Sequence, residues 1–219
     1  METLNSDEFY DRLARVFDAM TDWQKRLTLE MPFLQRTLDQ HRARTLLDTA
    51  CGTGWHAITL AKKGYTAAGC DASPQMIERA RANSAKAQAN VRFEVADFNQ
   101  LNHFTETFDA VLCLGNSMPH LLSQDALVEA MQQMRGNLRR GGVLILQNLN
   151  YDMRMKKKPR FFAVSRNRAF TSGRSTSPST CRENDSAKIG SIPLEQPAIM
   201  ESVPVGAIVV TVAFLSRGP

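Results

Sequence analysis

The sequence predicts an α/β fold with a Rossmann-like, doubly wound and mostly parallel sheet that carries helices on both faces. Apolar runs alternate with segments of helical periodicity between residues 45 and 149. The apolar runs are continuous rather than alternating, as expected for parallel strands covered on both faces. A glycine turn, Gly52-Thr53-Gly54, joins the first run to a helical segment, which is typical of the first crossover of this fold.

Two helices are expected before the first strand, and together they make residues 1–44 an N-terminal helical cap segment. Apolar residues such as Phe9, Leu13 and Val16 fall on one stripe, which predicts an amphipathic helix over 7–20. A second helix is expected over 22–40, where Pro32 marks a bend or a new start.

A Rossmann-like sheet domain is expected over residues 45–165. Strands are predicted at 45–50, 66–71, 91–96, 108–114 and 143–149, and helices at 55–63, 74–87 and 124–138. Ser73 and Pro74 form a helix start, with Ser73 as N-cap. Gly64 and the pair Gly141-Gly142 are predicted to end helices as C-caps.

The composition changes toward the end of the chain. Residues 1–152 hold 16 Lys and Arg against 18 Asp and Glu, a net charge of −2, whereas residues 153–219 hold 11 against 4, a net charge of +7. Residues 171–180 are rich in Ser, Thr and other turn formers, which favours disorder or loose packing. Residues 166–219 are therefore predicted to be an atypical, poorly ordered tail, with one strand over 207–215.

Several function classes are disfavoured by composition. The first eleven residues are acidic and lack the apolar region of a signal peptide, and the four cysteines show no CxxC spacing, so a cytoplasmic protein with reduced thiols is expected. The four histidines lack the spacing of metal ligands, so no metal site is expected. The basic run over residues 154–160 is interpreted as a solvated connector, which makes nucleic acid and membrane unlikely partners.

Carboxylates stand in or directly after three predicted strands and indicate a nucleoside ligand. Asp71, 17 residues after Gly54, can accept hydrogen bonds from two ribose hydroxyls or can cap the helix at Pro74. Asp97 can accept from an adenine amino group. The glycine turn alone also fits nicotinamide and flavin enzymes. Asp48 favours S-adenosylmethionine (SAM) instead, because the methionine end of SAM carries an ammonium group.

The motifs D-x-A-C-G-T-G, D-A-S, A-D, L-G-N-S-x-x-H-L, R-G-G-V-L-x-L and N-Y-D occur in this order. Over roughly residues 8–165 the chain resembles glycine N-methyltransferase and its bacterial relatives among the class I SAM-dependent methyltransferases. The resemblance implies SAM as cofactor and a small-molecule methyl acceptor, with transfer to an amine nitrogen. It places Arg26, 22 residues before Asp48, on the SAM carboxylate. The other implied cofactor contacts are Ala50, Gly52, Gly54, Ala72, Met76, Phe98 and Leu114.

Three further residues are candidates for the catalytic end of the site. Asn116 could orient the acceptor amine through its carbonyl oxygen. His120 could orient the amine or take its proton, or it could serve only at a helix start. Tyr151 could bind the acceptor or cap the end of a strand. Tyr10, Phe17 and Trp23 are candidates for an aromatic lid, or for simple helix packing.

The chain also departs from the family pattern. The family has an arginine for the substrate carboxylate directly before Asn-Tyr-Asp, and here that position is Leu149, so glycine itself is disfavoured as acceptor. The family continues with antiparallel strands, which residues 170–206 do not resemble, so these strands are expected to be missing or altered. A change of reading frame near residues 166–170, or a degraded copy, is one hypothesis for the tail.

Three other functions compete with this interpretation. The first is a nicotinamide-dependent Rossmann oxidoreductase, although the strand over 108–114 is followed by no acid–base pair suited to hydride transfer. The second is a non-catalytic SAM-binding protein whose C-terminus is incomplete. The third is an RNA methyltransferase aided by the basic run. The sequence does not fix the oligomeric state.

Overall fold

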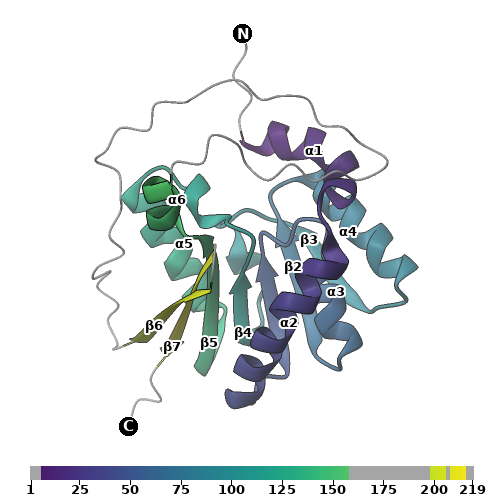
Figure 1. The fold of residues 1–219 in the computed structure, drawn as a ribbon. Coiled ribbons are helices and arrows are strands. Elements are labelled where there is room, and N and C mark those ends of the chain that lie inside the picture. The colour runs from purple at the N-terminus through teal and green to yellow at the C-terminus, as the bar shows by residue number, and fades with distance from the viewer. Residues whose placement is uncertain (1–5, 158–197, 206–207, 216–219) are drawn as a thin grey trace.

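The computed structural model describes residues 6–157, 198–205 and 208–215, and it confirms the doubly wound fold (Figure 1). One sheet has the strand order β3-β2-β1-β4-β5-β7-β6. The first five strands in this order pair in parallel, whereas β7 is antiparallel to both β5 and β6. The strands are β1 (Thr45–Thr49), β2 (Thr66–Asp71), β3 (Val91–Val95), β4 (Phe108–Cys113), β5 (Leu138–Leu149), β6 (Ala198–Val205) and β7 (Ile208–Leu215).

All five helices predicted from the sequence are present, with ends within two residues of those expected. The helices are α1 (Ser6–Met20), α2 (Trp23–Gln40), α3 (Trp55–Lys62), α4 (Pro74–Lys86), α5 (Gln124–Gly136) and α6 (Tyr151–Lys157), with short 3₁₀ turns η1 (Leu101–His103) and η2 (Met118–His120). Helix α2 continues through Pro32, so no new helix starts there. Ser73 caps α4 as predicted, because its hydroxyl accepts from the Met76 backbone N–H at 3.1 Å.

Two buried clusters lie on opposite faces of the sheet. Consecutive residues of β1 point to different faces, with Leu46 in one cluster and Leu47 in the other. The first cluster includes residues of α2, α3 and α4, and the second includes residues of η1 and α5. Burial on both faces explains why these strands read as continuous apolar runs.

One of the two predicted glycine caps is confirmed. Gly64 directly follows Lys63, the C-cap of α3. It has φ +95°, and its N–H donates to the Ala61 carbonyl at 3.0 Å, as expected for the left-handed glycine that ends a helix. The pair Gly141-Gly142 lies within β5 instead, where the register against β4 shifts between Phe108 and Ala110. Helix α5 ends earlier, at its C-cap Asn137.

The C-terminal strands correct part of the expectation for the tail. The strand predicted over 207–215 is present as β7, and β6 is a strand that was not predicted. The C-terminal antiparallel strands were expected to be missing or altered. The described residues include two such strands, so the expectation that they are missing is wrong. The Ser-rich stretch 171–180 and the proposed frame change near 166–170 lie outside the described residues.

Gly54 is required by packing as well as by its backbone conformation. It has φ +82°, and a Cβ there would lie 2.7 Å from Cζ of Phe93 and 3.0 Å from Cβ of Ala80. We expect Gly54→Ala to lower the free energy of unfolding by about 2–4 kcal/mol, from left-handed strain and overpacking together. Urea unfolding would measure the change.

Gly64→Ala is the matched control. Gly64 also has positive φ, but nothing lies within 4 Å of a Cβ built there. Gly64→Ala should therefore lower the free energy of unfolding only by the backbone strain, about 1–2 kcal/mol. Equal losses for the two variants would show that contact with Phe93 is not what requires Gly54.

Candidate functional site

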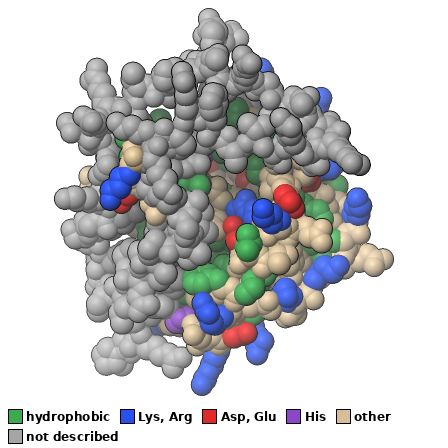
Figure 2. Space-filling model, in the orientation of Figure 1, with side chains coloured by type: hydrophobic (Ala, Val, Ile, Leu, Met, Phe, Trp, Pro, Cys, Tyr) green, Lys and Arg blue, Asp and Glu red, His purple; other side chains and the backbone are tan. Residues whose placement is uncertain are grey.

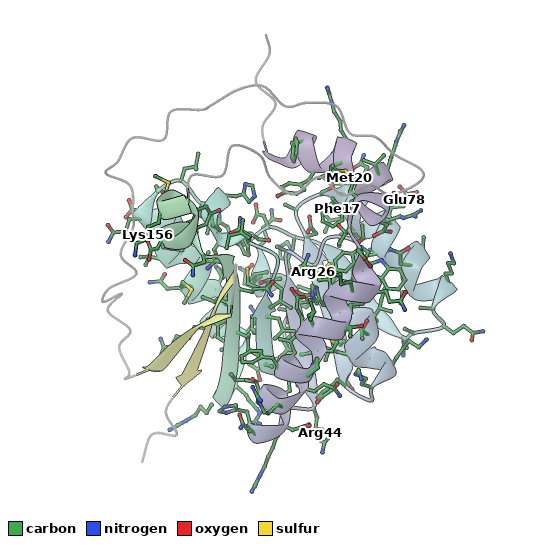
Figure 3. All side chains as sticks on the ribbon, viewed as in Figure 1. Phe17, Met20, Arg26, Arg44, Glu78 and Lys156 are labelled. Carbon is green, nitrogen blue, oxygen red and sulfur yellow. The ribbon has the colours of Figure 1, made fainter. Side chains whose placement is uncertain are left out.

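A cavity of about 300 Å³ opens at the carboxyl edge of the parallel strands. Residues of the loops that follow β1, β2, β3 and β4 line it, together with residues of α1 and α2. The strand order reverses between β1 and β4, and such a switch point is where α/β sheets bind ligands. Figure 3 shows Arg26 on α2 beside this edge and Arg44 at the opposite edge of the sheet.

The structure brings most of the predicted site residues to this cavity. The predicted cofactor residues that line it are Arg26, Asp48, Ala50, Gly52, Asp71, Ala72, Met76, Asp97, Phe98 and Leu114. The catalytic candidate His120 and the lid candidates Tyr10, Phe17 and Trp23 line it as well. Gly54 does not, because it lies against Phe93 and Ala80. Asn116 and Tyr151 are also not among the lining residues.

Asp71 joins the loops that follow β1 and β2. Its Oδ2 accepts from the Gly52 backbone N–H at 2.8 Å, and its Oδ1 accepts from the Ser73 N–H at 3.0 Å. The N-cap of α4 is Ser73, so Asp71 does not have that alternative role. The two backbone bonds fix the carboxylate at the end of β2, where it lines the cavity.

Asp48 is a buried carboxylate in the wall of the cavity. The residue is 1% exposed, and within the described structure neither side-chain oxygen has a hydrogen-bond partner. Burial, followed by the charge of Asp71, raises the pKa of Asp48 to about 8, against the opposing effect of Arg26. A buried carboxylate of this kind is stabilised in its charged form by a cation placed beside it.

Arg26 lies in a polar cluster with Glu30 and Gln147. Its Nε lies 3.2 Å from both Glu30 carboxylate oxygens, and its Nη2 donates to Gln147 Oε1 at 3.3 Å. Glu30 and Gln147 were not predicted as site residues. The i, i+4 spacing of Arg26 and Glu30 on a helix was a usable signal, whereas Gln147 lies in an apolar strand and is distant in sequence.

Asp18, near the end of α1, binds both the start of α2 and the glycine turn. It was not predicted as a site residue. Its Oδ1 accepts from the Thr53 hydroxyl at 2.6 Å and from the indole N–H groups of Trp23 and Trp55 at 3.0 and 3.1 Å. Its Oδ2 accepts from Arg79 at 3.0 Å. Burial alone would raise the pKa of Asp18, but hydrogen bonds from Thr53, Asn83, Arg79 and Trp23 lower it. The carboxylate therefore holds α1 beside the cavity.

The predicted catalytic residues form two hydrogen-bonded pairs. His120 Nε2 lies 2.9 Å from the Tyr10 hydroxyl of α1, and the Asn116 amide N–H donates to the Tyr151 hydroxyl at 2.9 Å. The carbonyl oxygen of Asn116, expected to orient an acceptor, already accepts from the Leu149 backbone N–H at 2.9 Å. Asn116 has φ +74°, an uncommon conformation for a residue other than glycine.

The described residues contain neither a cluster of metal-ligating side chains nor a membrane-spanning helix. In the part of the chain that the structure describes, no group of three or more His, Cys, Asp or Glu side chains could hold a metal ion. Among the helices of that same part, none combines the length and the apolar character needed to span a bilayer.

The sheet and the cavity at its switch point define the class of this protein as a Rossmann-like α/β domain with a ligand site at the carboxyl edge. Residues 46–142 match the family model described as a methyltransferase domain. The chain is 34% identical over 148 residues to a glycine/sarcosine N-methyltransferase of Aphanothece halophytica, covering 67% of this chain and 56% of that protein. Its counterpart from Parasynechococcus marenigrum (strain WH8102) is 38% identical, with 67% and 51% covered.

A solved structure shares the Rossmann-like fold of this chain. The PH0226 protein of Pyrococcus horikoshii OT3 has a TM-score of 0.64 at 19% identity, over 94% of this chain and 99% of that one. In sequence the chain thus resembles the class I SAM-dependent methyltransferases of the glycine N-methyltransferase type, as predicted. It spans about half the length of the curated relatives that it matches.

Proposed function

We propose that this protein is a SAM-dependent methyltransferase that acts on an amine nitrogen of a small molecule. The observation that carries the proposal is Asp48, a buried carboxylate without a partner in the described structure, in a cavity that Arg26 also lines. A carboxylate and a guanidinium in one cavity suit the ammonium and carboxylate of an amino acid.

The remaining cavity residues suit the nucleoside half of SAM. Asp71 would hold the ribose hydroxyls, and Asp97 with Phe98 would hold the adenine edge. Asp48 and Arg26 would hold the methionine end, and Leu114 would face it. When bound, SAM supplies an activated methyl group, so the protein needs to contribute little covalent chemistry.

The chain's own residues would supply alignment and exclusion of water. Placing an amine in line with the methyl group contributes on the order of several kcal/mol. Helix α1, fixed by Asp18 and by the Tyr10–His120 bond, would help keep water from the cavity, which favours a reaction that neutralises charge. His120 would accept the proton that an amine must lose before it can attack.

The acceptor is proposed to be an amine that does not depend on a carboxylate for binding. The relatives named above are glycine/sarcosine N-methyltransferases, which supports an amine. Among the described residues that line the cavity, however, Arg26 is the one Lys or Arg, and it is assigned to the cofactor. Leu149 also argues against an acceptor bound through its carboxylate, because a leucine side chain cannot pair with that group.

Titration calorimetry with SAM and with NAD, followed by methyl-transfer assays, tests the proposal. We expect one SAM to bind per chain, no binding of NAD, and faster methylation of glycinamide than of glycine, since the pair differs in the carboxylate. Binding of NAD without SAM would favour an oxidoreductase. SAM binding without transfer to any amine of a broad panel would favour a non-catalytic binding protein.

RNA methylation is the least supported of the alternatives. On the face shown in Figure 2, the Lys and Arg side chains of the described residues are spread apart and interspersed with Asp and Glu. The basic run predicted as a connector is divided. Its first part lies in α6 (Tyr151–Lys157), and Lys158 and Arg160 fall outside the described residues.

A further inference from the structure

The guanidinium of Arg26 is held on three sides. Its Nε faces both oxygens of Glu30 at 3.2 Å, and its Nη2 donates to Gln147 Oε1 at 3.3 Å. Its Cζ lies 5.2 Å from the centre of the Trp23 ring, within the range of a cation–π contact. An arginine side chain has many rotamers when free, so these contacts select one of them.

Glu30 and Gln147 are themselves held in place. Glu30 Oε2 lies 2.7 Å from His56 Nε2, and Glu30 Oε1 accepts from Gln147 Nε2 at 2.8 Å. Burial lowers the pKa of His56, so the neutral ring donates to the carboxylate. Burial alone would raise the pKa of Glu30, but the bond from His56 and the charge of Arg26 lower it to about 2. Glu30 is therefore ionised across the neutral range.

Gln147 extends this cluster to the loop after β4. Its Oε1 also accepts from the Gly115 backbone N–H at 2.9 Å, and its backbone carbonyl accepts from the Asn116 N–H at 3.1 Å. The same side chain thus contacts Arg26 from α2 and the turn that holds Asn116. Gln147 is 6% exposed, so its amide could not exchange these partners for water without a rearrangement.

We propose that Glu30 and Gln147 are positioning residues that fix the Arg26 guanidinium in the orientation that binds the cofactor carboxylate. This inference rests on the proposed function, because it takes SAM as the ligand of the cavity. The alternative is that the cluster only joins α2 to the sheet. The two roles differ in one measurable respect, since only positioning makes the effect of a substitution depend on the ligand's carboxylate.

Glu30→Gln provides the test, with titration calorimetry against SAM and against decarboxylated SAM, which lacks only the carboxylate. We expect the variant to weaken SAM binding by at least about tenfold, as loss of a charge-assisted contact does. Binding of decarboxylated SAM should change by less than about twofold, within the usual effect of a remote substitution. The same selectivity is expected for Gln147→Leu, which keeps the cluster's net charge and covers the case in which Glu30→Gln does not fold.

Glu106→Gln is the matched control, because Glu106 also pairs with an arginine, Arg92, but on the exposed surface. It should leave both affinities unchanged. Equal weakening of SAM and decarboxylated SAM by Glu30→Gln and Gln147→Leu, or no weakening of either, would overturn the positioning role. Failure of the unaltered protein to bind SAM would instead overturn the proposed function.

Discussion

Replacing Asp71 by asparagine is expected to weaken SAM binding by at least about a hundredfold. In the proposed complex the carboxylate accepts from the ribose hydroxyls, and hydrogen bonds to a charged group contribute about 1.5–3 kcal/mol each. Asp71 is already oriented by the Gly52 and Ser73 backbone N–H groups, at 2.8 and 3.0 Å. An amide can accept from only one side, and its NH₂ group would face a donor. Titration calorimetry with SAM would measure the loss.

Asp109→Asn is the control for this change. Asp109 Oδ2 likewise accepts from two backbone N–H groups, those of Arg44 at 2.6 Å and Thr45 at 2.9 Å. It lies at the start of β4, away from the carboxyl edge of the sheet, and it does not line the cavity. Asp109→Asn should therefore lower stability without changing SAM affinity in the folded protein. A similar loss of affinity in both variants would mean that Asp71 acts through the fold alone.

The strands of the parallel sheet were predictable because burial on both faces leaves continuous apolar runs. The prediction failed where that pattern breaks. Strand β5 begins at Leu138, whereas its start was predicted at residue 143. The first residues of the strand were not recognised because Arg139, Arg140 and two glycines interrupt the apolar run. Strand β6 (Ala198–Val205) contains Glu201 and Pro204, residues that are depleted in strands.

The cofactor end of the site was predictable for a different reason. Asp48, Asp71 and Asp97 each stand in or directly after a strand, and parallel strands bring such positions to one edge. Glu30 carried only the helical i, i+4 spacing from Arg26 as a signal, and Gln147 carried none, since it meets Glu30 across 117 positions of sequence. They come together because α2 and β5 share one buried cluster. Asp18 was missed for the same reason, because its contacts join α1 to α2, the glycine turn, α3 and α4.

Asp48 should make SAM binding dependent on pH. Its pKa is raised to about 8 in the ligand-free protein, chiefly by burial, so the acid is mostly protonated at pH 7. Pairing with the cofactor ammonium would favour the carboxylate, and binding would then release a proton. Affinity should rise with pH by up to about tenfold per unit below pH 8. It should level off where the ammonium itself deprotonates, at about pH 7.7–8.0 for an ordinary α-amino group.

The same shift makes stability depend on pH in the opposite direction. Because the pKa rises on folding from 3.8 to about 8, the native protein holds a proton that the unfolded chain has released between these values. The resulting stabilisation is complete below about pH 4 and is lost as pH rises through about 8. Asp48→Asn should remove both trends: ligand-free melting temperatures should fall less between pH 6 and 9, and calorimetry in buffers of different ionisation enthalpy should detect no proton release on SAM binding. If the unaltered protein binds SAM with no proton release at pH 7, Asp48 is already ionised before the cofactor arrives, and the cation that it needs must come from the protein itself.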